Sequence, residues 1–529
     1  MKGRLLTSLL TALTLTSLQA QTIPVAPKLV LGITIDQLRS DYMEAFSALY
    51  GEKGFRRLLK EGRIYCSANY NFSPTDRASA VASIYTGTTP YNHGIIGGEW
   101  MDRNTLQMVQ CVDDKAFMGV YTAENTSPKN LLVSTISDEL KVATLGKAVV
   151  YAIAPFRDAA VFSAGHAADG AFWLNDDTGK WAGSTFYGNF PTWVIAYNDR
   201  NGLDTRIQDL VWEPYHASGA YTYFSALNSD GFKHRFTDTY RKYRNFKTSG
   251  LVNDEVNRLA TTCLRNTAIG TDNITDFLAV TYYAGNFEHK SAFEYPIEIQ
   301  DTYARLDRHI EELLEAAEKK VGIQNLLVFI TSTGYADVEV SDYLSEYRIP
   351  TGEFYMDRCT ALLNMFLMAT YGQGQYVEAY NGLHIYLDQK LIEKKQLNLV
   401  QVMAKAAEFL AQFSGVKSVY TSQDLRLNAY TPEAMRMRNA YNGKCSGDII
   451  LDVAPGWKLM NEDVTKDHPY RIVRDSYLEF PLIFWGAGTK PELIHTPATV
   501  DCIAPTLAHF MRIRAPNACS VAPLTDLNK

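Results

Sequence analysis

The sequence predicts a doubly wound α/β fold, in which a mostly parallel sheet carries helices on both faces. Apolar runs typical of strands buried on both faces recur along the chain. Amphipathic helical stretches lie between several of these runs. The 529 residues, of which 46% are hydrophobic, allow a sizeable core. Strands that alternate with helices in this way form a sheet sandwiched between two helical layers.

The first predicted strand covers residues 28–36, reads KLVLGITID and ends in a carboxylate. Further strands are predicted at residues 147–153, 276–283, 325–331 and 480–485, and a long amphipathic helix at 302–320. Ligands of parallel sheets bind beyond the carboxyl ends of the strands. Asp36 therefore stands where the chemistry of such folds is usually carried out.

Two segments interrupt this pattern within an α/β domain predicted over residues 28–529. Residues 172–253 are rich in Trp, Tyr, Gly, Asn and Asp, which is typical of a cap inserted over a site. Residues 344–432 contain a predicted strand at 382–387 and a predicted helix at 399–413. We interpret this second segment as a small α+β insertion.

The N-terminus has the pattern of a secretory signal peptide over residues 1–20. Lys2 and Arg4 precede an apolar, Leu-rich stretch at 5–18, and Ala20 offers a small residue for cleavage before Gln21. The stretch is short for a membrane anchor, and no later window has about 18 uninterrupted apolar residues. We therefore predict a mature protein in the periplasm or secreted, without a transmembrane span.

Charge and cysteine content exclude several classes of function. The 51 Lys and Arg residues against 58 Asp and Glu residues give a formal charge of -7 without a long basic run, which argues against nucleic acid as a partner. None of the seven cysteines forms a C-x-x-C pair, so zinc ribbons and thioredoxin motifs are excluded. Most of the cysteines are expected to be buried apolar side chains. Export permits disulfides, and their pairing stays open.

Seven short strings, in this order along the chain, resemble one family. They are IDQLRSDY at 35–42, SIYTGTTPYNHGI at 83–95, AGHAADGAFWLNDDTGKW at 164–181, DTYARLDR at 301–308, PTG at 350–352, SGDI at 446–449 and IAPT at 503–506. Together they resemble the periplasmic, threonine-nucleophile alkaline phosphatases of the PafA type, within the alkaline phosphatase and nucleotide pyrophosphatase superfamily. The resemblance implies an alkaline phosphatase-like core, two zinc ions and a threonine at a helix N-terminus that attacks phosphorus.

The catalytic residues of that family are largely replaced at the matching positions. Asp36 matches the first carboxylate ligand, whereas Arg77 occupies the place of the nucleophile. Gly98 replaces an asparagine that binds a phosphate oxygen, and Phe156 and Asp158 replace a Lys-x-Arg pair. The remaining metal-ligand positions fall on Asn286, Lys290, Thr333, Gly334 and Tyr470. Of the inventory that the resemblance implies, only Asp36 remains.

Other polar residues near these positions could in principle rebuild a site. Spare carboxylates and imidazoles are Asp76, His289, Asp337 and His468. A shift of one residue rescues only His289 or Asp337, and each then lacks its partner ligand. Thr75 and Ser79 carry hydroxyls, but both lie two residues from the position of the nucleophile. His93 and His166 lie in strings that hold no metal, and we expect structural roles for both.

The replacements at the nucleophile and metal-ligand positions remove negative charge and add positive charge. A dizinc site balances its charge with three carboxylates, which would repel one another without metal. Here two acids have become Asn286 and Thr333, and two cations, Arg77 and Lys290, enter near Asp36. We predict a metal-free, ion-paired cluster in which Arg77 begins a helix and points toward Asp36, with Lys290 as a second internal cation.

Two functions remain open on the sequence alone. The first is an exported pseudo-phosphatase, without a cofactor, that binds an anionic small molecule or an envelope protein. The alternative is an active phosphomonoesterase or phosphodiesterase with an atypical site that works with one metal, zinc, or with none. Metal content separates the first function from the metal form of the alternative, because that form requires near-stoichiometric zinc.

Overall fold

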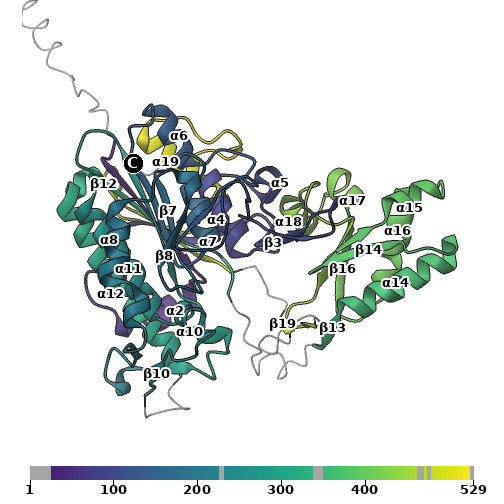
Figure 1. Cartoon of the computed structure of the whole chain (residues 1–529), viewed down its shortest axis with the longest axis horizontal. Coiled ribbons are helices and arrows are strands. Elements are labelled where there is room, and N and C mark those ends of the chain that lie inside the picture. Colours follow the sequence, from purple (N-terminus) through teal and green to yellow (C-terminus); the bar gives the residue numbers. More distant parts are fainter. Residues whose placement is uncertain (1–25, 225–230, 337–349, 461–469, 473–477, 525–529) are drawn as a thin grey trace, which may run out of the picture.

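The centre of the structure is an 11-stranded mixed sheet with helices on both faces (Figure 1). The computed structural model describes residues 26–224, 231–336, 350–460, 470–472 and 478–524. Within them the strand order is β21-β2-β20-β12-β1-β11-β6-β7-β8-β5, with β22 beside β2. The five strands from β12 to β7 run parallel, and β20 and β8 flank them in antiparallel orientation. This confirms the predicted doubly wound α/β fold.

All five strands predicted from apolar runs belong to this sheet. The bounds are β1 (Leu29–Asp36), β6 (Val150–Ala154), β11 (Asp276–Tyr283), β12 (Leu326–Ser332) and β20 (Phe480–Gly486). The other strands are β2 (Arg63–Asn69), β5 (Gly119–Val120), β7 (Gly170–Leu174), β8 (Trp181–Ser184), β21 (Glu492–Ile494) and β22 (Ala498–Thr499). Every residue of β1 is buried, as its continuous apolar run predicts.

Side chains of the central strands alternate between two cores, one on each face of the sheet. In β1, Val30 enters one core, while Leu29, Leu31, Ile33 and Ile35 enter the other. The first core is covered by α4 (Arg77–Thr86), α6 (Ile136–Ala143), α7 (Arg157–Ala164) and α19 (Ile503–Met511). The second is covered by α3 (Phe55–Glu61), α11 (Leu251–Asn266) and α12 (Pro296–Val321). The predicted helix at 302–320 lies inside α12.

The segment predicted as a cap starts within the sheet, because β7 and β8 cover its first residues. The chain beyond β8 forms short elements around a cluster that contains buried Trp212. These elements are α9 (Leu203–Arg206), β9 (Val211–Trp212), β10 (His234–Arg235) and α10 (Lys242–Lys247), whereas α8 (Thr192–Asn201) packs Val194 and Tyr197 into the second core. The last helix, α10, brings Lys247 to the carboxyl end of β7, where its ammonium donates to the carbonyl of Leu174.

A smaller lobe with its own core stands beside the sheet, drawn in green at the right of Figure 1. Its four-stranded sheet has the order β14-β15-β17-β16. The strands are β14 (Val377–Asn381), β15 (His384–Leu387), β16 (Val416–Thr421) and β17 (Ile449–Val453). The helices α14 (Met356–Tyr371) and α16 (Leu399–Leu410) contribute to the same core. The predicted strand at 382–387 and helix at 399–413 correspond to β15 and α16, while β17 lies beyond residue 432.

An ion pair joins the lobe to the main sheet domain. A hairpin of β3 (Glu99–Met101) and β4 (Met108–Gln110) reaches toward the lobe, and Arg103 lies in its turn. Arg103 donates to both carboxylate oxygens of Asp448, at 3.1 and 3.2 Å, and to the carbonyl of Ser446. Asp448 also accepts bonds from Leu387 N and Gln389 Nε2. The turn is therefore tied to the strands of the lobe.

All seven cysteines are free, and five of them are buried, which agrees with apolar rather than cross-linking roles. In the part of the chain that the structure describes, no helix is both long and apolar enough to cross a membrane. The predicted signal peptide at residues 1–20 lies outside the described residues.

Candidate functional site

Asp36 ends the central strand β1 and is fully buried. Thr333, directly after β12, donates its hydroxyl to Asp36 Oδ1 at 2.9 Å. The Thr333 hydroxyl oxygen accepts the backbone N–H of Gln37, and Tyr335 also hydrogen-bonds the Asp36 carboxylate. Parallel pairing of β1 with β12 brings these residues to one edge of the sheet. The carboxylate is therefore surrounded by donors from its own protein chain.

Arg77 is the first residue of α4 and points toward Asp36, as predicted. Its Nη1 lies 3.5 Å from Asp36 Oδ2, and its Nε donates to Asp158 Oδ1 at 2.8 Å. The guanidinium also covers the ring of Phe156, with Cζ 3.8 Å from the ring centroid. One cation is thus held between two carboxylates, and it occupies the position that the family resemblance gives to the nucleophile.

Asp76 fixes the start of α4. Its Oδ1 accepts the backbone N–H of Ser79, whose hydroxyl in turn accepts the N–H of Asp76, which completes a capping box. Its Oδ2 accepts the N–H of Gly98 at 2.7 Å. Both oxygens of this spare carboxylate therefore serve the backbone, and the same contact places Gly98 near the cluster. Ser79 belongs to the box as well, so its hydroxyl is already bonded.

The charged cluster continues through Lys247, a residue that the sequence did not single out. Lys247 is buried, and its ammonium nitrogen lies 4.7 Å from the centroid of the Phe156 ring. The same nitrogen pairs with a carboxylate oxygen of Asp176 at 2.6 Å. A cavity of about 250 Å³ adjoins these side chains and Arg157. Trp173 also borders the cavity, and its buried Nε1 has no hydrogen-bond partner among the described residues.

Burial and charge pairing set the protonation of the cluster. Desolvation raises the pKa of Asp36, against the opposing effects of Arg77, Thr333 and Tyr335. Burial also acts to raise the pKa of Asp158, but Arg77 and the other donors outweigh it, so the pKa of Asp158 is lowered. Burial opposes the charge of Arg77, yet Asp158, Tyr335 and Asp36 raise its pKa well above the usual value. Arg77 is therefore a permanent cation.

Lys290 does not supply the second internal cation, and that prediction is wrong. Its side chain is 44% exposed and lies 3.5 Å from Glu288 Oε2 and 3.2 Å from the hydroxyl of Tyr295. The preceding residues, Glu288 and His289, have positive φ values of 51° and 55°, and this turn leads the chain to the surface before Lys290. Buried Lys247, from the predicted cap, takes the role of the second cation.

The position of Gly334 leaves no room for a metal-binding side chain. Its φ is +67°, and a Cβ on it would lie 2.5 Å from the ring of Tyr70 and 2.7 Å from Phe480. Tyr70 is held there because its hydroxyl donates to the carbonyl of Ser332 at 2.9 Å. Another position that the resemblance assigns to the metal site, Asn286, is buried and is the N-cap residue of the short helix at Phe287–His289.

The remaining sequence-predicted residues lie apart from this cluster or outside the described chain. Tyr470 begins β19 (Tyr470–Ile472), which pairs with β18 (Lys458–Met460). Asp337 and His468 fall outside the described residues. His93 is fully buried between Ser83 and the N–H of Ile95, and burial lowers its pKa to about 3. His166 bonds Asp138 and the carbonyl of Leu131, so both histidines have the structural roles expected.

Four residues of the cluster were missed from the sequence: Tyr70, Asp176, Lys247 and Tyr335. Tyr335 follows Thr333 by two residues beyond β12, so its place at the carboxyl end of a central strand was a usable signal. Tyr70 comes directly after β2 and offered a similar signal. Lys247 lies in α10 within a segment without a motif, and nothing in the sequence places it there.

A mostly parallel doubly wound sheet, with its polar cluster beyond β1 and at the start of α4, is the alkaline phosphatase-like α/β architecture. The chain belongs to the type I phosphodiesterase / nucleotide pyrophosphatase family, which it matches over residues 30–477. It is 30% identical over 521 residues to alkaline phosphatase PafA from Elizabethkingia meningoseptica, covering 95% of this chain and 94% of that protein. It is 29% identical over 523 residues to alkaline phosphatase PhoV from Synechococcus elongatus, covering 95% and 93% respectively.

Solved structures agree with this assignment. The crystal structure of wild-type PafA matches with a TM-score of 0.84 and 29% identity, covering 95% of this chain and 99% of that one. A second PafA structure, with a TM-score of 0.83 and 29% identity, carries substitutions at a threonine, an asparagine, a lysine and an arginine, and it too covers 95% of this chain and 99% of that one. These are the four residue types that the resemblance aligned with Arg77, Gly98, Phe156 and Asp158.

Proposed function

We propose that this chain is an exported, catalytically inactive member of the family, that its central site holds no zinc, and that it acts by binding an envelope protein. The observation that carries the proposal is the position of Arg77 between Asp36 and Asp158. A guanidinium stays protonated and has no lone pair to offer as a nucleophile at neutral pH. The replacement therefore removes the first chemical step of phosphoryl transfer.

The donors around Asp36 do not fit a zinc pair. Zinc in such sites requires several carboxylate or imidazole ligands. Thr333 instead donates to Asp36, and Tyr70 fills the space beside Gly334. In the described part of the chain, no three His, Cys, Asp or Glu side chains form a group suited to a metal ion. We therefore derive no catalytic step through zinc.

The charge of the cluster favours a protein partner over an anionic small molecule. Arg77 is shared by Asp36 and Asp158, and Lys247 is paired with Asp176. Arg157, the third cation that borders this cavity, pairs with Asp113 and Glu124, and Lys290 pairs with Glu288 elsewhere. An anion entering here would compete with carboxylates that already pair with all three cations. This pairing argues against the anionic ligand predicted from the sequence.

The test is an assay of the purified chain with p-nitrophenyl phosphate and bis(p-nitrophenyl) phosphate, beside zinc analysis. We expect substoichiometric zinc and hydrolysis that is no faster than for Asp36→Ala. Arg77→Thr should gain no turnover, because the other replaced positions remain. Hydrolysis that is abolished both by a chelator and by Asp36→Ala would contradict the proposal and establish the zinc-dependent hydrolase.

Export has its own test. The full chain expressed in a Gram-negative bacterium should be found in the periplasmic fraction, shortened at its N-terminus. A chain that stays in the cytoplasmic fraction and still carries residues 1–20 would contradict this part of the proposal.

A further inference from the structure

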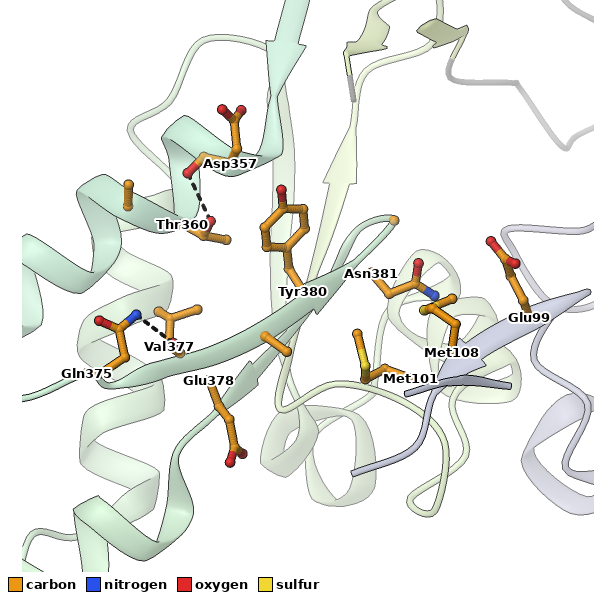
Figure 2. Close-up of a pocket in the computed structure, with 13 residues that line it drawn as sticks. Glu99, Met101, Met108, Asp357, Thr360, Gln375, Val377, Glu378, Tyr380 and Asn381 are labelled. Atoms are coloured by element: carbon orange, nitrogen blue, oxygen red, sulfur yellow. Dashed lines mark hydrogen bonds between the residues drawn. The ribbon is translucent and has the colours of Figure 1, made fainter. Parts of the chain in front are cut away.

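A groove of about 630 Å³ lies between the small lobe and the hairpin β3–β4 (Figure 2). The lobe contributes the strand β14 and the first turns of α14, including Asp357 and Thr360. The hairpin contributes Glu99, Met101 and Met108. The groove is distinct from the Arg77 cluster, because the two cavities share no lining residue.

One wall of this groove is the edge of a sheet. β14 is the end strand of the order β14-β15-β17-β16, and within the described residues it pairs with β15 alone. An edge strand presents backbone N–H and C=O groups to whatever lies beside it. Such an edge binds an extended polypeptide by accepting it as an additional strand. The groove thus has the element that this mode of recognition requires.

The charge of the groove selects the kind of polypeptide. Its lining contains the carboxylates of Glu99, Asp357 and Glu378, and no Lys or Arg is among the lining residues described. Oδ1 of Asp357 is shielded from solvent and accepts no hydrogen bond from the described residues. A ligand does not reach this shielded oxygen, but the carboxylates of Glu99 and Glu378 are exposed and would accept charge-assisted hydrogen bonds from its Lys or Arg side chains.

Apolar side chains supply the rest of the contact surface. Met101 and Met108 stand on the hairpin side, and Met108 is 45% exposed. Along α14, the exposed Met365 lies one turn beyond the lining residue Ala361. Flexible methionine side chains adapt to different apolar partners. The groove therefore fits a strand in which basic and apolar side chains alternate.

We propose that this groove binds an extended, basic segment of a partner protein, which adds to β14 as a further strand. The inference rests on the proposed function, because it assigns the surface and the chemistry of the partner that function requires. Backbone pairing with β14 gives affinity, and Glu99 and Glu378 select Lys or Arg side chains.

The probe is a short fluorescein-labelled peptide of alternating lysine and valine, measured by fluorescence anisotropy with the full chain. Two matched peptides test the mechanism. The first replaces lysine with glutamate, and the second keeps lysine but is N-methylated at alternate amides. We expect the lysine peptide to bind, the glutamate peptide not to bind, and the N-methylated peptide to bind at least about tenfold more weakly, because it has lost its strand hydrogen bonds.

Two variants locate the binding site. Glu378→Lys reverses a charge in the groove at an exposed position, and we expect it to weaken binding by about fivefold or more. Glu393→Lys makes the same change at an exposed position of α15 (Gln389–Lys394), outside the groove lining, and should leave the affinity unchanged.

Lack of binding by the lysine peptide would overturn the proposal. Equal binding of the N-methylated peptide, or equal weakening by Glu378→Lys and Glu393→Lys, would also overturn it, since both results indicate unspecific charge attraction. Phosphatase turnover in the same preparation would contradict the proposed inactivity while leaving the peptide result intact, so the two failures are distinguishable.

Discussion

The ring of Tyr70 occupies the space that a side chain on Gly334 would need, because a Cβ added to Gly334 would lie 2.5 Å from that ring. Because Gly334 also has a φ of +67°, two independent costs oppose a larger residue there. Tyr70 is fixed by its hydrogen bond to Ser332, so the ring cannot simply move aside. The site is closed to an added ligand at this position by packing as well as by sequence.

We therefore expect Gly334→Ala to lower the free energy of unfolding by about 3 kcal/mol, from the clash together with the left-handed backbone. Gly146 is the matched control, since its φ is +78° and nothing lies within 4 Å of its Cβ. Gly146→Ala should cost only about 1 kcal/mol, which is the backbone contribution. Urea unfolding measures both, and equal losses would contradict the packing argument.

The pairing of Arg77 with two acids predicts a large effect of removing its charge. Arg77→Met leaves Asp36 and Asp158 facing each other without their cation, and should destabilise the fold by about 3 kcal/mol. Arg56→Met, at an exposed pair with Glu52, should cost less than about 1 kcal/mol.

The double variant Arg77→Met with Asp158→Asn should recover part of the loss, because one of the two unpaired acids is then neutral. A double variant that is less stable than Arg77→Met alone, in the same urea experiment, would show that charge pairing is not what Arg77 contributes.

Lys247 and Lys290 should differ in how much each contributes to the free energy of unfolding, as a buried pair and an exposed pair do. Lys247→Met breaks a buried pair with Asp176 and should destabilise by about 3 kcal/mol. Lys290→Met removes an exposed charge, so its unfolding midpoint should shift little, corresponding to less than about 1 kcal/mol. Thermal unfolding of both variants checks the order, and a larger loss for Lys290→Met would contradict the assignment of Lys247 as the internal cation.

Stability should also depend on pH through Asp158. Its pKa is lowered in the folded chain, so its contribution is complete above the unfolded pKa of about 4 and is lost as the pH falls through the folded pKa. Asp158→Asn lacks this contribution at every pH. We expect the wild type to lose more stability than Asp158→Asn as the pH is lowered from about 6 to 3, and parallel curves in urea unfolding would refute the pairing.

The fold could be predicted from the sequence because a buried strand requires a matching pattern of apolar residues. β1 and β11 are continuous apolar runs, since both of their faces are covered, and their observed bounds lie within a residue of the predicted ones. The start of α4 was equally accessible, because Asp76 and Ser79 form a local capping box. Such features depend on residues near one another in the chain.

The site could be predicted only in part, because it is formed by residues that are far apart in the sequence. Arg77 was placed correctly since it shares a helix start with the family nucleophile position. Lys290 was misplaced because position in a motif says nothing about a local reversal such as that at Glu288 and His289. Lys247 reaches Asp176 and Phe156 from α10, across more than seventy residues of sequence, and no spacing rule records that approach.

The contact between Arg103 and Asp448 has a mechanical consequence. Asp448 lies just before β17 and binds Leu387 of β15 with the same carboxylate, so the hairpin turn is clamped to two strands of the lobe at once. The lobe therefore cannot rotate against the hairpin without breaking the three hydrogen bonds that Arg103 donates to Asp448 and Ser446. The Arg103–Asp448 contact thus fixes the position of the lobe relative to the hairpin. Unfolding of the lobe should therefore release the hairpin in the same cooperative step.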